Sequence, residues 1–152
     1  MRLGVKEFFV DLSFRINRLL ELISPAVDLI ARIYVARIFI LSGWSKLSDW
    51  DSTLFLFMSE YHVPLLPPVL AAVMGTAGEL VFSIMLALGV FTQAAALGLF
   101  MVNAMAVISY YSELSGSPAA IRDHLEWGII LAGLMVNTSH LLSFDRIRRL
   151  IS

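Results

Sequence analysis

The sequence lacks cysteine altogether, which excludes disulfide bonds, thiolate metal ligands and thiol–disulfide chemistry by this chain alone. It is also poor in charge, because 15% of its 152 residues are charged, against about 25% in an average soluble domain. The formal net charge of −1 gives no sign of nucleic-acid binding. The sequence has no glycine-rich phosphate loop, nucleophile elbow, metalloprotease motif or recognisable flavin motif.

Apolar residues are correspondingly abundant. They make up 59% of the chain and give a mean hydropathy of +0.82, whereas soluble domains are about 45–50% apolar. A helix needs about 20 mostly apolar residues to cross a bilayer. The sequence therefore predicts an all-α integral membrane protein, a compact four-helix transmembrane bundle with spans at about 25–47, 67–88, 92–110 and 120–142.

Local signals mark the ends of these spans. Serine–proline pairs at 24–25 and 117–118 place an N-capping residue before proline, which is typical of the first turn of a helix. Gly89 indicates a tight turn between the second and third spans. The fourth span is the least regular, because its apolar run from Trp127 to Val136 is short and is followed by a polar segment.

The distribution of lysine and arginine predicts the topology. The terminal segments carry seven of these residues, whereas the segments on the other side of the spans carry two, Lys46 and Arg122. Because loops rich in Lys and Arg stay in the cytoplasm, we predict that both termini are cytoplasmic, as an even number of spans requires.

Outside the spans, residues 1–22 have the pattern of an amphipathic helix. Charged residues recur there at three- and four-residue spacing, with large apolar residues between them. We predict a helix in the cytoplasmic interface of the membrane; the alternative is an arm packed on the bundle or on a neighbouring subunit. Residues 23–146 form the predicted membrane domain, and 147–152 a basic tail. In the outer loop, the apolar stretch 53–58 predicts a short helix.

Ionisable residues inside the predicted spans point to function. A charge near the middle of a bilayer costs at least about 2.5–3.5 kcal/mol, so it usually faces the protein interior with a partner. Counting about 1.5 Å of rise per residue places Glu79 between Arg32 and Arg37 in depth, with Asn103 close to Arg37. We therefore predict that Arg32 pairs with Glu79, and that Arg37 is a second partner or faces another subunit. Such a pair either lines a ligand pocket or only fixes the register of the helices.

An ordered motif runs along the first span, and its members are Arg32, Phe39, Gly43, Lys46 and Leu47. This motif resembles the DoxX family of small bacterial membrane proteins, whose first span runs Arg-x3-Gly-x2-Phe-x3-Gly-x2-Lys-Leu. Alanine stands here in place of the first glycine of that pattern.

Further matches extend the resemblance over roughly residues 25–146. They are the stretch from Gly75 through Glu79 to the turn at Gly89, the acid Glu126 at the start of span four, and the triplet 143–145. The Gly-Pro-Gly that usually precedes that triplet is absent.

The resemblance implies a four-helix, multi-pass protein of the bacterial inner membrane. Some members are described as a subunit of a thiosulfate:quinone oxidoreductase, and others as a membrane partner that links soluble redox and sulfur-transfer enzymes. Our first hypothesis is a quinone-linked oxidoreductase subunit in which Glu79 carries a proton. Electrons would come from a partner or a bound cofactor. The predicted ligand-binding residues are Arg32, Arg37, Lys46, Asn103 and Glu126.

Other functions stay open. The chain could be a non-catalytic membrane anchor that recruits soluble partner enzymes, or a small-solute carrier, which would need a homo-oligomer. Imidazole and carboxylate groups in the outer segments could bind zinc or copper, although they match no standard ligand motif; these residues are His62, Asp123, His124 and Glu126. His124 and Glu126 could instead admit protons beside a quinone. Methionines in the spans could bind Cu(I), but methionine is also ordinary packing material.

Overall fold

The computed structural model describes residues 2–137. Within that range all regular secondary structure is helical, which confirms the all-α prediction. The helices are α1 (Arg2–Ser48), α2 (Trp50–Ser59), α3 (Pro68–Leu88), α4 (Thr92–Ser109), α5 (Tyr111–Leu114) and α6 (Pro118–Val136). The predicted basic tail and the triplet 143–145 lie outside the described residues.

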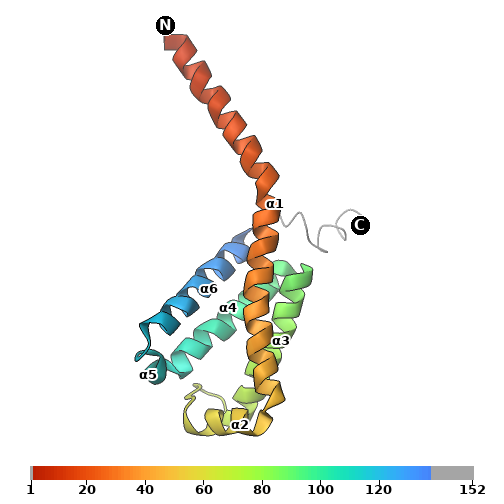
Figure 1. Ribbon diagram of the computed structural model, residues 1–152, viewed down its shortest axis with the longest axis vertical. Helices are drawn as coiled ribbons and strands as arrows, with labels where there is room; N and C mark the ends of the chain where they lie inside the picture. The colour runs from red at the N-terminus through yellow and green to blue at the C-terminus, as the bar shows by residue number, and fades with distance from the viewer. Residues whose placement is uncertain (1, 138–152) are drawn as a thin grey trace.

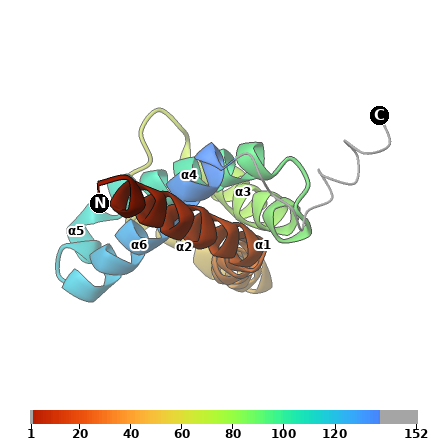
Figure 2. The same cartoon turned by 90° about the horizontal axis from the view of Figure 1, so that it is seen from above.

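Four of the helices pack in sequence around a common core. Helix α1 lies along α3, α3 along α4, α4 along α6, and α6 contacts α1 again (Figures 1 and 2). Each contributes fully or nearly fully buried apolar side chains to one cluster, including Val35, Phe39, Leu86, Leu99 and Leu131. Helix α2 crosses below α3 in Figure 1 and packs on it through Phe57.

Among the described helices, α3 and α4 are long and apolar enough to cross a membrane by length and composition alone. Their mean hydropathies over 18 residues are 1.9 and 1.5. Helices α1 and α6 carry more ionisable residues than α3 and α4. Whether those residues have partners bears on whether α1 and α6 can also cross a membrane.

Helix α1 differs from the sequence-based prediction. It is 47 residues long and passes through Pro25 without ending, so the helix start predicted at residues 24–25 is wrong. A proline inside a helix removes one backbone hydrogen bond, but the helix can continue with a kink. Figure 1 shows that the N-terminal half of α1 continues beyond the other helices. The placement of residues 1–22 in a membrane interface stays a prediction.

The other predicted boundaries fare better. Ser117 and Pro118 do begin α6, with proline at the first helical position. This helix ends at Val136, and the segment 138–142 that would complete the predicted span lies outside the described residues. The turn at Gly89 is confirmed, because its left-handed backbone (φ 69°) ends α3 and lets the N–H of Val90 donate to the carbonyl of Met85 at 2.9 Å.

Helix α2 confirms the short helix predicted at 53–58. It begins after Asp49, whose carboxylate accepts a hydrogen bond from the backbone N–H of Ser52 at 3.1 Å. This N-cap satisfies one of the backbone donors that a helix start leaves free. Hydrogen bonding to Ser52 also lowers the pKa of Asp49, so the cap is charged at neutral pH.

Candidate functional site

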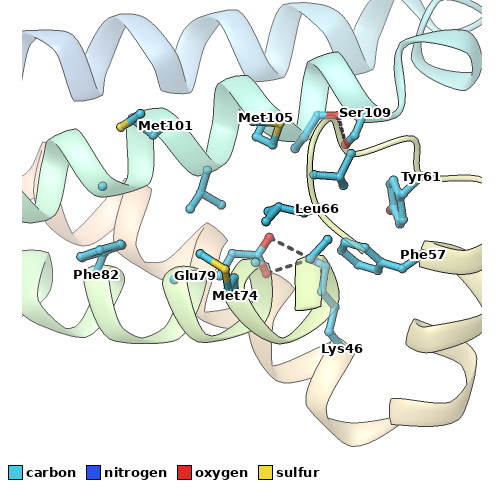
Figure 3. A pocket seen from close by; sticks show the side chains of 17 residues that line it. Lys46, Phe57, Tyr61, Leu66, Met74, Glu79, Phe82, Met101, Met105 and Ser109 are labelled. Carbon is cyan, nitrogen blue, oxygen red and sulfur yellow. Dashed lines mark hydrogen bonds and ion pairs between the residues drawn. The ribbon is translucent and has the colours of Figure 1, made fainter. Parts of the chain in front are cut away.

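A cavity of about 360 Å³ lies between α3, α4 and the segment that follows α2 (Figure 3). Its walls are mostly apolar, and Phe57, Leu66, Phe82 and Val102 are among the side chains that form them. The polar side chains on the wall are Lys46, Tyr61, Glu79 and Ser109. A concave, mainly apolar site with a few convergent polar groups is the usual form of a small-molecule pocket.

The charged part of this wall is an ion pair between α1 and α3. The Lys46 Nζ donates to both carboxylate oxygens of Glu79 at 2.8 Å. The same ammonium donates to the Ser42 Oγ at 2.8 Å, and that hydroxyl donates to the Glu79 Oε1 at 3.3 Å. The Lys46 and Glu79 side chains are only 21% and 8% exposed, so their attraction is little screened by solvent.

Helix direction and one glycine bring these two side chains together. Helices α1 and α3 lie antiparallel (Figure 1), and side chains lean toward the N-terminus of their own helix, so Lys46 and Glu79 lean toward each other. Gly43 lies at the level of Glu79 and allows the two backbones to approach closely. A Cβ atom at Gly43 would come within 2.8 Å of the Leu80 Cγ and 3.2 Å of the Glu79 Cβ.

We therefore expect Gly43→Ala to weaken the contact between α1 and α3. The added methyl group must displace Leu80 and crowd the base of the Glu79 side chain, which outweighs the gain of about 1 kcal/mol in helix propensity. Thermal unfolding in detergent checks this, with Gly133→Ala as the matched control, because a Cβ there meets nothing within 4 Å. Equal melting temperatures for the two variants would contradict the role assigned to Gly43.

Close packing between α3 and α4 shapes the other end of the cavity. The Phe82 ring lies directly on the backbone of α4, since a Cβ at Gly98 would come within 2.6 Å of it. Met74, Met101 and Met105 also line the cavity, and their side chains are 54%, 64% and 38% exposed. The cavity is therefore bordered by flexible apolar side chains that reach the outer surface of α3 and α4.

Tyr61 closes the cavity on the side of the loop after α2. Its ring lies between the rings of Phe57 and Tyr110, with centroid distances of 4.7 and 4.6 Å. Burial raises the pKa of Tyr61, and the carboxylates of Glu79 and Glu60 add to this effect. The phenol therefore keeps its proton at neutral pH and is a hydrogen-bond donor on the pocket wall.

The predicted pairing of Arg32 with Glu79 is wrong. Arg32 is completely buried, and its Nε donates to the Asp28 Oδ2 at 3.0 Å, one turn earlier in the same helix. Its Nη1 lies 3.5 Å from the carbonyl oxygen of Leu86. The Asp28 Oδ1 accepts from the Asn137 Nδ2 at 3.1 Å, so this second cluster joins α1 to the ends of α3 and α6.

The remaining predicted residues do not join the cavity either. Arg37 is exposed and makes no ion pair or side-chain hydrogen bond among residues 2–137. Asn103 is buried between α4 and α6, where it donates to the carbonyl of His124 at 2.9 Å and contacts the His124 ring at 2.7 Å. Glu126 accepts a hydrogen bond from the Tyr34 hydroxyl at 2.8 Å.

The structure thus separates the six predicted site residues into distinct clusters, and only Lys46 and Glu79 share the cavity. Two relevant residues were missed. Asp28 stands four positions before Arg32, a helical spacing that could have indicated the pair. Tyr61 comes from an irregular loop, and no sequence spacing indicates that it meets α3 and α4.

Metal binding by the outer segments has no structural support. Within the described part of the chain, no three His, Asp or Glu side chains converge as metal ligands would. His124 and Glu126 instead contact Asn103 and Tyr34, and neither lines the cavity.

These features define an all-helical protein in which two described helices are long and apolar enough to cross a membrane, with a buried ion pair beside an apolar cavity. The sequence model of the DoxX family matches residues 27–112, and the chain belongs to this family. The match includes the C-terminal part of α1 together with α2, α3 and α4, but not α6, so Glu126 lies outside it.

The chain is also similar to "Inner membrane protein YphA" of Escherichia coli (strain K12), with 36% identity over 94 residues. The aligned region covers 60% of this chain and 65% of that protein, which is less than two thirds of its length. No solved structure matches the chain.

Proposed function

We propose that this chain is a four-span protein of the bacterial inner membrane that binds a quinone headgroup in the cavity beside Lys46 and Glu79, as the membrane subunit of a redox complex. The observation that carries this proposal is the ion pair on the wall of an otherwise apolar cavity. Family membership and the similarity to an inner membrane protein support the location.

The placement of charges supports α1 and α6 as additional spans. Each packs along α3 or α4. Two ionisable residues that lower the hydropathy of α1 have partners inside the protein, Asp28 for Arg32 and Glu79 for Lys46. The charged residues of α6 lie in its first half, where the exposed Glu126 accepts a hydrogen bond from Tyr34. A paired and buried charge is tolerated in a bilayer far better than an isolated one. With four spans, the excess of Lys and Arg in the terminal segments supports cytoplasmic termini.

The composition of the cavity supports an amphiphilic ligand that enters from the bilayer. Exposed methionines border the cavity, and in a bilayer these side chains would face lipid. A volume of about 360 Å³ lies within the range of known ligand pockets, which is about 300–1,000 Å³. An isoprenoid quinone has a ring small enough to fit in this volume and a tail that would remain among the lipids.

Three side chains can serve the chemistry of a quinone. Lys46 and Tyr61 are hydrogen-bond donors that suit the carbonyl oxygens of the ring, and Glu79 is an ionisable group beside them that can exchange a proton. Reduction of a quinone to a quinol consumes two electrons and two protons. Because the chain has no cysteine and no recognisable metal or flavin motif, a partner protein or its cofactor would supply the electrons.

Filling the cavity tests the proposal. Gly75 lines the cavity, and a Cβ there meets only the Phe57 ring at 3.7 Å, so a larger side chain can enter without a backbone clash. We expect Gly75→Leu to weaken binding of decylubiquinone at least about tenfold, or about 1.4 kcal/mol, with an unchanged melting temperature. Native mass spectrometry in mild detergent, titrated with decylubiquinone, measures this.

Gly133→Leu is the matched control, because that position borders open space. Binding that is equal in both variants, or absent from the wild-type protein, would contradict the proposal.

A second function is favoured by a different feature. The N-terminal half of α1 projects beyond the other helices (Figure 1), and its described side chains from Glu7 to Ile23 are exposed. A non-catalytic anchor that recruits soluble enzymes would have such a projection. Deletion of residues 2–22 separates the two functions, since an anchor would lose its partners while decylubiquinone binding would persist.

A further inference from the structure

The projecting half of α1 carries a regular seam of apolar side chains. They follow one another at alternating spacings of three and four residues: Phe9, Leu12, Ile16, Leu19, Ile23, Ala26, Ile30 and Ile33. All eight are exposed in the single chain. The seam covers 24 residue steps, which corresponds to about 36 Å along the helix axis.

We propose that this seam is a parallel helix–helix interface with a second copy of the same chain. Apolar residues that repeat every 3.5 positions on average keep one face of a helix turned toward a supercoiled partner, and eight consecutive positions make up four heptads. Leu20 and Leu22 flank the seam and widen it. An isolated helix of this kind would otherwise leave its large side chains uncovered, for example Phe9 at 62% and Leu19 at 62% exposure.

The charge of the segment favours a protein partner over the membrane surface. Helices that lie in the interface are typically rich in Lys and Arg on their polar face, which attract anionic lipids. Residues 2–23 carry four basic and three acidic residues, a net charge of only +1. Two of the opposite charges, Arg15 and Asp11, pair with each other at 2.9 Å along the helix.

The direction of α1 also favours a second copy of the chain over the membrane surface. A helix that lies flat on the membrane must turn sharply away from the direction of the span that follows it. Here α1 runs unbroken through Pro25, so the segment leads away from the other helices (Figure 1). The seam also continues without interruption from Ile23 to Ile30 and Ile33 on the exposed face beside α3 and α6. Two copies inserted in the same sense would meet along it in parallel.

The absence of native cysteine makes the interface directly testable by disulfide mapping. Single cysteines are placed at seam positions 12, 16 and 19 and, as controls, at positions 17, 18 and 21 on the polar face. Full-length protein in native membranes is oxidised with copper phenanthroline. In a parallel interface, equivalent seam residues from the two copies face each other, so we expect cross-linked dimers from Leu12→Cys, Ile16→Cys and Leu19→Cys. The three control variants should give no cross-linked dimer.

A charge in the seam provides the second measurement. Leu19→Glu should abolish the cross-link of Ile16→Cys, whereas Asn17→Glu on the polar face should leave it unchanged. Because residues 9–23 are exposed and do not pack on the other described helices, neither change should lower the melting temperature of the protein. Equal cross-linking at seam and control positions would overturn the proposal. So would seam cysteines that never cross-link, and their protection from aqueous maleimide would then identify the bilayer as the partner.

Discussion

Replacement of Glu79 by leucine is expected to lower the free energy of unfolding by about 3–5 kcal/mol, which is the usual cost of removing one partner of a buried ion pair. The reason is that the variant leaves the Lys46 ammonium, only 21% exposed, beside an apolar cavity without its carboxylate. The Ser42 hydroxyl still accepts from Lys46, but it carries no compensating charge. Denaturant unfolding in mixed micelles, followed by intrinsic fluorescence, measures the loss.

The double variant Lys46→Met/Glu79→Leu separates a structural pair from a functional one. Replacement of both partners by apolar residues of similar volume is often neutral for stability, so we expect most of the loss to be recovered. Binding of decylubiquinone should nevertheless stay lost, because the cavity then lacks its charged donor and its proton carrier. If the double variant binds like wild type, the pair only fixes the register of α1 against α3, and the quinone proposal loses its basis.

The sequence predicted the burial of charged residues only in part, and it did not predict how they pair. Arg32 and Glu79 stand in apolar segments and are 0% and 6% exposed, whereas Arg37, in the same apolar segment as Arg32, is exposed. Pairing depends on the relative heights of two helices. The Ser-Pro signal at 24–25 suggested a common inner end for α1 and α3, but α1 continues past it. Glu79 consequently lies level with Gly43 rather than between the two arginines.

Residue spacing along a helix gives the depth of each Cα atom but not the position of the charged group at the end of the side chain. Side chains lean toward the N-terminus of their helix, so the charged group lies at a different depth from its Cα atom. Lys46 therefore reaches inward to Glu79, and Arg32 reaches inward to Asp28. The cavity itself could not be predicted at all. It depends on Tyr61 and its loop meeting α3 and α4, and this contact between distant segments leaves no local sequence pattern.

Arg32 and Arg37, which both lie in α1, should behave very differently when each is replaced by methionine. Arg32→Met removes one partner of an ion pair whose side chains are 0% and 2% exposed, so we expect a loss of about 3–5 kcal/mol in the free energy of unfolding. Arg37→Met changes an exposed side chain that has no ion-pair partner in the described range, and its effect should stay within about 0.5 kcal/mol.

The two variants are compared by denaturant unfolding in the same mixed micelles. The substitution is identical and both positions lie in α1, so helix propensity cancels and the difference reports the environment of each guanidinium. Equal losses would contradict this assignment and would require a partner for Arg37. The proposed seam offers a direct check of that outcome, because Arg37 stands four residues beyond Ile33, at the next position of the seam pattern, on the side where the second copy would lie. A loss at Arg37 that disappears when Leu19→Glu separates the copies would place its partner on the neighbouring chain.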